Sequence, residues 1–163
     1  MPKPTIRLAD AADIPAVAAL IQALDSHHDG RSSPLEATAA MVEASMATRE
    51  GTRYALAVLD GRPVGLACFA ILRPGTDLGG LIFLKDLFVE HQARNQAVGA
   101  AMMAWLADYA RSQGIARIDL TTGSANKGAQ SFYERLGAER LDKVAYRFDL
   151  TGGLLSVRNA ENA

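Results

Sequence analysis

The stretch that decides the fold is LKDLFVEHQARNQAVGAAMMAWL, residues 84–106. An apolar strand ends at Val89, and the short polar loop EHQARNQA leads directly into a helix predicted over residues 97–113. Such a junction leaves the first N–H groups of the helix unpaired, and together with the helix dipole they form a site suited to a pyrophosphate. Arg94 adds a fixed positive charge, although an ordinary helix start with an exposed arginine has the same pattern. Small residues that let a phosphate approach the backbone are Ala97, Gly99, Ala100 and Ala101.

Apolar periodicity and turn signals place the other elements around this junction. Strands are predicted at residues 5–9, 54–59, 64–72, 81–89, 116–122 and 140–150, and further helices at residues 14–24, 35–46 and 127–136. SHHDGRSS, residues 26–33, reads as a loop between the first two helices. The order β-αα-βββ-α-β-α-β predicts an α/β (α+β) fold, with a mixed sheet and helices on both faces. We expect one domain over residues 1–163, with a core of about residues 4–150 and a tail at 151–163.

Composition narrows the class of protein. The chain has 163 residues, 49% of them hydrophobic and 21% charged, and a formal net charge of −1, which suits one ordinary domain. No basic patch indicates a nucleic-acid partner, and no apolar run is long enough to cross a membrane. The N-terminus lacks the apolar core of a signal peptide, and the single cysteine, Cys68, lies inside an apolar run. A cytoplasmic location is the resulting expectation.

Two sequence blocks carry a family resemblance. Arg94-Asn95-Gln96-Ala97-Val98-Gly99 resembles the R/Q-x-x-G-x-G/A signature of the GNAT superfamily of N-acetyltransferases. NKGAQSFYERLGA, residues 126–138, is similar to the family's N-x-x-A-x-x-F-Y-x-x-x-G-F/A block, and it lies one helix and one strand downstream, as in the family. Ala97 departs from the signature, where the family has its first glycine. We expect alanine to hold a helical conformation here and the phosphate site to survive.

The resemblance implies a GNAT-like sheet that splays at its centre and a bound acetyl-CoA as acyl donor, with no metal. The end of the strand at residues 87–89 would pair with the pantetheine arm through its backbone, and the amides of residues 95–100 would hold the pyrophosphate. Asn126 would form a hydrogen bond with the arm from the opposite side, and Phe132 would pack against the arm. The residues assigned to the cofactor are Leu87, Phe88, Val89, Arg94, Asn95, Gln96, Ala97, Val98, Gly99, Ala100, Asn126, Ala129 and Phe132.

Tyr133 is the candidate catalytic acid that the resemblance implies. Attack of an amine on a thioester releases a thiolate, and a tyrosine hydroxyl within hydrogen-bond reach of the sulfur can supply its proton. Without the resemblance, Phe132-Tyr133 would read as a core pair on a short helix.

The reaction also needs a base, because an ammonium has no lone pair with which to attack. Strand alternation places Asp86 on one face with Leu84 and Phe88, and the opposite face would then carry Lys85. This charged pair inside an apolar strand indicates either a lined cleft or a simple salt bridge. The candidate bases are Asp86, Glu90, His91, His27 and His28. Of these, Asp86 is the predicted catalytic residue.

Within the superfamily, the segments IRLADAADI, IFLKDLFV and SFYERLGA resemble the spermidine/spermine (diamine) acetyltransferase group. That group has an acidic residue where Lys85 stands and a Tyr-Glu pair where His27-His28 stands. A polyamine would meet repulsion from Lys85, so the expected acceptor is a small primary amine that also bears a carboxylate, such as an amino acid or derivative. His27, His28 and Lys85 are therefore the predicted substrate-binding residues.

The resemblance to this group also predicts the assembly, and two other functions compete with the enzyme. Relatives in this group commonly dimerise, and we expect a homodimer with apolar contacts from Leu154, Leu155 and Val157. The competing interpretation is a non-catalytic acyl-CoA-binding module. A nucleotide-binding domain fits less well, because the chain lacks G-x-G-x-x-G and P-loop patterns.

Overall fold

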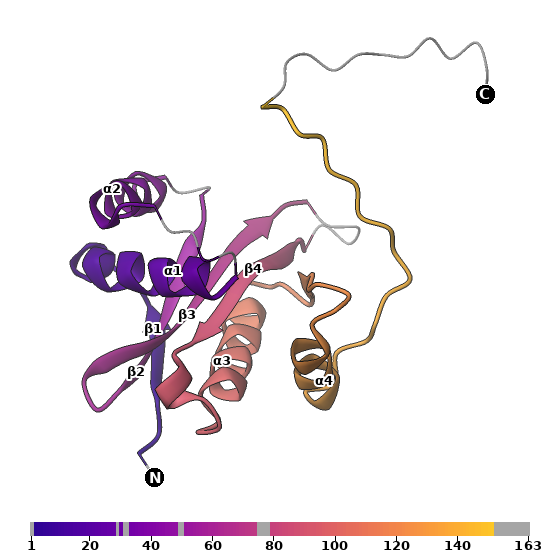
Figure 1. Ribbon diagram of the computed structural model, residues 1–163. Coiled ribbons are helices and arrows are strands. Elements are labelled where there is room, and N and C mark those ends of the chain that lie inside the picture. Colours follow the sequence, from indigo (N-terminus) through magenta and orange to yellow (C-terminus); the bar gives the residue numbers. More distant parts are fainter. Residues whose placement is uncertain (1, 29, 31–32, 49–50, 75–78, 152–163) are drawn as a thin grey trace. The chain divides into compact units, whose positions relative to one another are not determined.

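The computed structural model describes residues 2–28, 30, 33–48, 51–74 and 79–151 (Figure 1). The chain forms two compact units, Met1–Asn126 and Lys127–Ala163.

The first unit is built on a five-stranded mixed sheet. Its strands follow one another in the order β1-β2-β3-β4-β5. The first four strands pair in antiparallel fashion, whereas β4 and β5 are parallel because α3 connects them. The strands are β1 (Thr5–Leu8), β2 (Arg53–Leu59), β3 (Arg62–Leu72), β4 (Leu81–Val89) and β5 (Ile118–Leu120).

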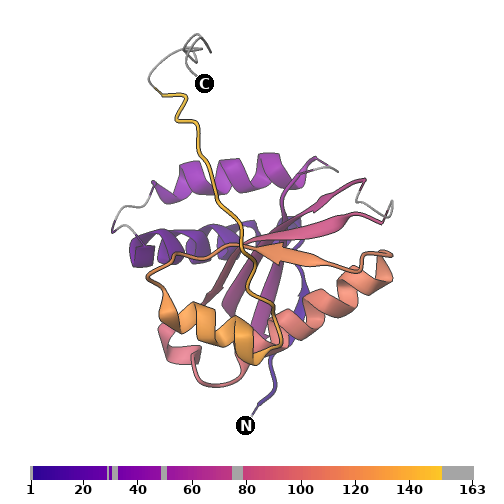
Figure 2. The ribbon, with the colours of Figure 1, turned by 90° about the vertical axis from the view of Figure 1, so that its right-hand side faces the viewer.

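Helices cover the two faces of this sheet. α1 (Ile14–His28) and α2 (Leu35–Met46) lie on one face, and α3 (Val98–Ser112) lies on the other. Figure 2 shows α1 and α2 on the opposite side of the sheet from α3. The predicted elements of this unit are confirmed, with two differences. α1 continues through residues 26–28, which the sequence assigned to a loop, and β5 is shorter than the predicted strand at residues 116–122.

Each face has its own buried core. On the α3 face, the apolar stripe of the helix packs against alternate residues of β2, β3 and β4, among them Ala57, Phe69 and Leu84. On the other face, α1 and α2 pack against Leu56 and Leu66 and their neighbours. Burying a large apolar side chain stabilises the fold by about 1.5–3 kcal/mol, so these two cores hold the strands that position the site.

The second unit contains one described helix, α4 (Lys127–Arg135), which ends with Gly137 in a left-handed conformation (φ 90°). The strand predicted over residues 140–150 is wrong for the described chain: these residues have no strand structure. Their alternating apolar side chains are exposed, with Val144 75% and Tyr146 89% accessible. A strand forms only against the backbone of another strand, and among the described residues of this unit there is none. Apolar alternation alone was therefore not enough to predict a strand at residues 140–150.

Candidate active site

A break in strand pairing defines the candidate site. β5 pairs with β4 only through Leu84, which lies opposite Leu120, whereas β4 continues to Val89. Beyond Leu84, β4 keeps its partner β3 on one side, and Glu90 N–H still donates to Val64 O at 2.9 Å. Backbone groups alternate in direction along a strand, so those of residues 87 and 89 point away from β3, toward the side that β5 has left. A strand edge of this kind can pair with an extended ligand.

A β-bulge sits at the same point. Asp86 pairs with Cys68 and Leu84 pairs with the next residue, Phe69, so that Lys85 is the extra residue. An extra residue reverses the faces on which all later side chains lie. Leu84 accordingly packs in the α3 core, whereas Phe88 packs in the core under α1 and α2.

The bulge corrects the predicted arrangement of the strand. Regular alternation put Asp86 on the same face as Leu84, but Asp86 lies with Phe88 on the face opposite Leu84. Leu87 and Val89 turn their partly buried side chains toward the α3 core, which leaves their backbones as the groups available to a ligand.

The charged groups on the α1 side of β4 form a small cluster. Lys85 Nζ lies 2.6 Å from Asp86 Oδ2, with 68% of the lysine side chain but only 21% of the aspartate side chain exposed. The hydrogen bond to Asp86 raises the pKa of Lys85, and the charge of Asp25 on α1 acts in the same direction. The ammonium therefore stays protonated. Sequence reasoning missed Asp25, although its place one turn before His28 is a signal once α1 is extended.

Cys68 pairs with Asp86 across the β3–β4 ladder. Its side chain is buried, and burial raises the pKa of the thiol to about 12. A thiol that stays protonated is a poor nucleophile, which confirms the core role predicted from the sequence.

The two histidines predicted to bind substrate lie in the last turn of α1. The His27 ring centroid is 6.5 Å from that of Phe88 and 5.8 Å from that of His28, and both histidines are exposed. The structure thus brings His27 to the same face of β4 as Asp86. It shows no described hydrogen bond from either imidazole, so the role of both in binding stays a prediction.

The other two candidate bases lie beyond β4. Glu90 forms an ion pair with Arg62 at 2.9 Å, and His91 begins a short 3-10 helix, His91–Ala93, with its side chain exposed. Asp86 is therefore the candidate base that combines partial burial with a place on the strand at the bulge.

The loop that follows β4 turns its arginine back onto the strand. Arg94 Nε donates to Val89 O at 3.1 Å, which holds the guanidinium at the end of β4; the carbonyl has a second lone pair and can accept another hydrogen bond. Gln96 Nε2 donates to Gln92 O at 3.0 Å, so this side chain stabilises the loop. Asn95 adopts the left-handed conformation (φ 62°), which asparagine tolerates better than most residues.

Ala97 is the N-cap of α3, and its conformation corrects the expectation that it is helical. It is left-handed, with φ 58° and ψ 12°. An alanine side chain has no oxygen to cap the helix, so the first amides of α3, on Val98, Gly99 and Ala100, are not capped by it. The N–H groups of these residues point outward from the N-terminal end of α3, where the positive end of the helix dipole favours an anion.

The remaining predicted residues are divided between the two units. Asn126 ends the first unit, with its N–H donating to Gly123 O at 2.9 Å. In the second unit, Ala129, Phe132 and Tyr133 of α4 are partly buried, and the two rings meet edge to face at 5.1 Å. Their roles toward a cofactor remain predictions.

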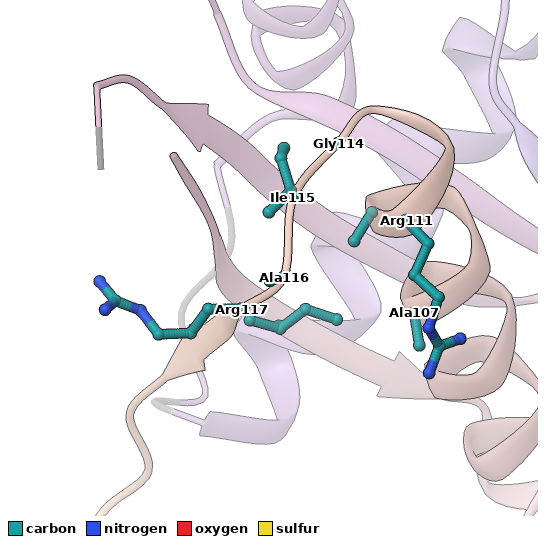
Figure 3. A pocket seen from close by; sticks show the side chains of 8 residues that line it. Ala107, Arg111, Gly114, Ile115, Ala116 and Arg117 are labelled. Carbon is teal, nitrogen blue, oxygen red and sulfur yellow. The ribbon is translucent and has the colours of Figure 1, made fainter. Parts of the chain in front are cut away.

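A separate pocket of about 380 Å³ lies in the first unit, between the end of α3 and the start of β5 (Figure 3). Small apolar groups line it, and Arg111 and Arg117 flank them. Each arginine has an ion-pair partner, Asp108 at 2.8 Å and Asp119 at 3.2 Å. None of the predicted site residues lines this pocket, so it is not part of the candidate site.

Comparison with known proteins shows the family to which the chain belongs. The chain matches the Acetyltransferase (GNAT) family over residues 18–138 and belongs to that family. It is 29% identical over 97 residues to an uncharacterized N-acetyltransferase of Methanocaldococcus jannaschii, over 59% of this chain and 43% of that protein. It is 28% identical over 146 residues to aminoglycoside N(6')-acetyltransferase type 1 of Stenotrophomonas maltophilia, over 88% of this chain and 91% of that protein.

A solved structure shows the same fold. An aminoglycoside N-acetyltransferase in complex with CoA has a TM-score of 0.76 and 21% identity, over 92% of this chain and 97% of that one.

Among the described helices, none is long and apolar enough to span a membrane.

Proposed function

We propose that the protein transfers the acetyl group of acetyl-CoA to a primary amine of a small molecule, an amino acid or a derivative of one. The observation that carries this proposal is the end of β4–β5 pairing at Leu84, which leaves one edge of β4 open as far as Val89, followed after a short loop by a helix start that lacks a side-chain cap. The pantetheine arm would pair with the backbone of Leu87 and Val89, since the backbone groups of Phe88 face β3, and the pyrophosphate would bind the first amides of α3 beside Arg94.

In the proposed reaction, the amine nitrogen attacks the thioester carbonyl carbon. The C–N bond forms, the C–S bond breaks, and the CoA thiolate takes a proton from the Tyr133 hydroxyl. Asp86 accepts the proton that the substrate ammonium must lose, directly or through water. After the attack the nitrogen is cationic and loses its second proton, through water, to the Tyr133 phenolate, and Asp86 returns its proton to solvent before the next cycle.

The acceptor, assembly and compartment are parts of the same proposal. Relatives named for aminoglycoside and thialysine acetylation support an acceptor that is a small amine. Lys85 favours an amine that also carries a carboxylate over a polyamine. We expect a homodimer, which light scattering at micromolar concentration would detect; Leu154, Leu155 and Val157, the predicted contacts, lie outside the described residues. The lone Cys68 suits a reducing cytoplasm.

Calorimetry with acetyl-CoA tests the cofactor site. Gly99→Asp puts a carboxylate into the first turn of α3, where it suits the helix dipole and preserves the fold but repels a pyrophosphate. Binding should weaken at least tenfold. Ala104→Asp adds the same charge to an exposed position of the same helix and should bind like the wild type. Equal affinity in all three folded proteins would exclude this site.

Release of free CoA thiol over a panel of amines tests the enzyme activity. Tyr133→Phe keeps the ring, so acetyl-CoA affinity should stay within a few-fold, whereas loss of a general acid lowers turnover by about 10²–10⁴-fold. Because water can protonate a thiolate, the lower end is expected. Wild-type turnover in the variant would exclude Tyr133 as the acid. Binding of acetyl-CoA without thiol release for any amine would favour an acyl-CoA-binding module instead.

A further inference from the structure

The Lys85–Asp86 ion pair offers two opposite charges at one point of the bulge, 2.6 Å apart. The two side chains differ in freedom. Asp86 is held at 21% exposure within the sheet, whereas Lys85, 68% exposed, has a long flexible stem that can turn into solvent without leaving a buried charge. The carboxylate position is therefore fixed, and the ammonium position is adjustable.

We propose that this ion pair is the receptor for a zwitterionic acceptor: the substrate ammonium displaces Lys85 from Asp86, and Lys85 then binds the substrate carboxylate. This inference rests on the function proposed above and names the substrate as an α- or β-amino acid, whose two charges are only a few bonds apart. The ammonium would lie inward at Asp86, and the carboxylate would lie outward, where Lys85 can follow it.

Acceptors of other classes would leave the ammonium of Lys85 without a partner. A simple amine or an amide that takes Asp86 would displace Lys85 and give it no anion in return. A polyamine would do the same and would also place its second ammonium beside Lys85, where like charges repel. Asp25 adds one more negative charge to the same face, which favours the ammonium end of any substrate but offers nothing to a carboxylate. Of the three charged groups Asp25, Asp86 and Lys85, the lysine is the one that can bind the carboxylate.

Matched acceptors test the proposal: L-alanine, L-alaninamide and ethylamine as one set, and L-lysine, L-lysinamide and cadaverine as the other. The wild type should prefer the acid of each set. Lys85→Gln should lower kcat/KM for the acid about tenfold or more, mainly through KM, as expected for loss of a hydrogen bond between charged groups. It should raise kcat/KM for the amide and the amine, because Asp86 is then free of its ion-pair partner. Lys85→Arg should retain the preference.

Arg111→Gln is the matched control, since it removes a cation of similar exposure, 72%, from an ion pair on α3. It should behave like the wild type. The proposal is overturned if the wild type prefers amides or amines, or if Lys85→Gln changes acid and amide by the same factor. The first result would make the site one for simple amines, and the second would make Lys85 a general competitor for Asp86.

Calorimetric titration of the same acceptors into the CoA-saturated protein separates this inference from the proposed reaction. If no amine is acetylated but L-alanine or L-lysine binds and Lys85→Gln abolishes that binding while sparing the amides, the reaction is wrong and the zwitterion receptor stands. If neither amino acid binds the wild type, the receptor is overturned whatever the enzyme does.

Discussion

Replacing Ala97 by glycine should stabilise the protein, although glycine usually weakens a helix. Ala97 has φ 58° and ψ 12°, a conformation that costs a residue with a Cβ about 1–2 kcal/mol. Glycine removes this cost but gives the unfolded chain more freedom, which offsets about 0.4–1 kcal/mol. The net gain is about 0.5–1 kcal/mol. For a chain of this size, it raises Tm by about 1–4 °C.

A second substitution of alanine by glycine in the same helix is the control. Ala104 lies at an exposed position in the interior of α3, where glycine costs about 1 kcal/mol relative to alanine. Urea unfolding should therefore move the midpoint up for Ala97→Gly and down for Ala104→Gly, with the same slope. If both variants are destabilised equally, Ala97 is not left-handed in solution, and the helix start described above is wrong.

Two other predictions concern the packing and charge of the first unit. A Cβ on Gly65 would lie 2.9 Å from Met102 Sδ and 3.2 Å from Phe88 O, so Gly65→Ala should lower the free energy of unfolding by about 1–3 kcal/mol; an unchanged urea midpoint would mean that α3 lies farther from the sheet. The hydrogen bond from Arg7 lowers the pKa of Asp13 below 3.8, so its stabilisation is present above that pH and is lost as pH falls through the lowered pKa. The stability difference between wild type and Asp13→Asn should thus be larger at pH 7 than at pH 3, and a constant difference would contradict it.

Local signals predicted most of the first unit. The Asp60-Gly61 dipeptide between two apolar runs marks the β2–β3 hairpin, and both residues adopt positive φ there. The apolar spacing from Val98 to Tyr109 predicted α3 within one residue at each end. These features depend on residues that are close in the sequence, so they can be predicted from one sequence alone.

The features that the sequence did not reveal depend on distant partners or on exceptions to a rule. Alternation in β4 is regular in the sequence, and the extra residue Lys85 is recognised only when the strand is paired with β3. The left-handed Ala97 could not be read from composition, because alanine strongly favours a helix. The absent strand at residues 140–150 shows that an apolar alternation predicts a surface to bury, not the backbone that will cover it.

The bulge at Lys85 also bears on how β4 can be altered or recombined. Leu84 and Asp86 already pair with consecutive residues of β3, so deleting position 85 would remove the bulge and leave Asp86 and Leu87 on their present faces, whereas deleting any later residue of β4 would turn the side chains on one side of the deletion to the opposite face. A chimera that grafts a relative's strand must therefore match the insertion before it matches any side chain. A gap misplaced by a single position in an alignment would transfer the wrong residue to the acceptor side, so acceptor residues of this protein should be compared with others only after the bulge has been aligned.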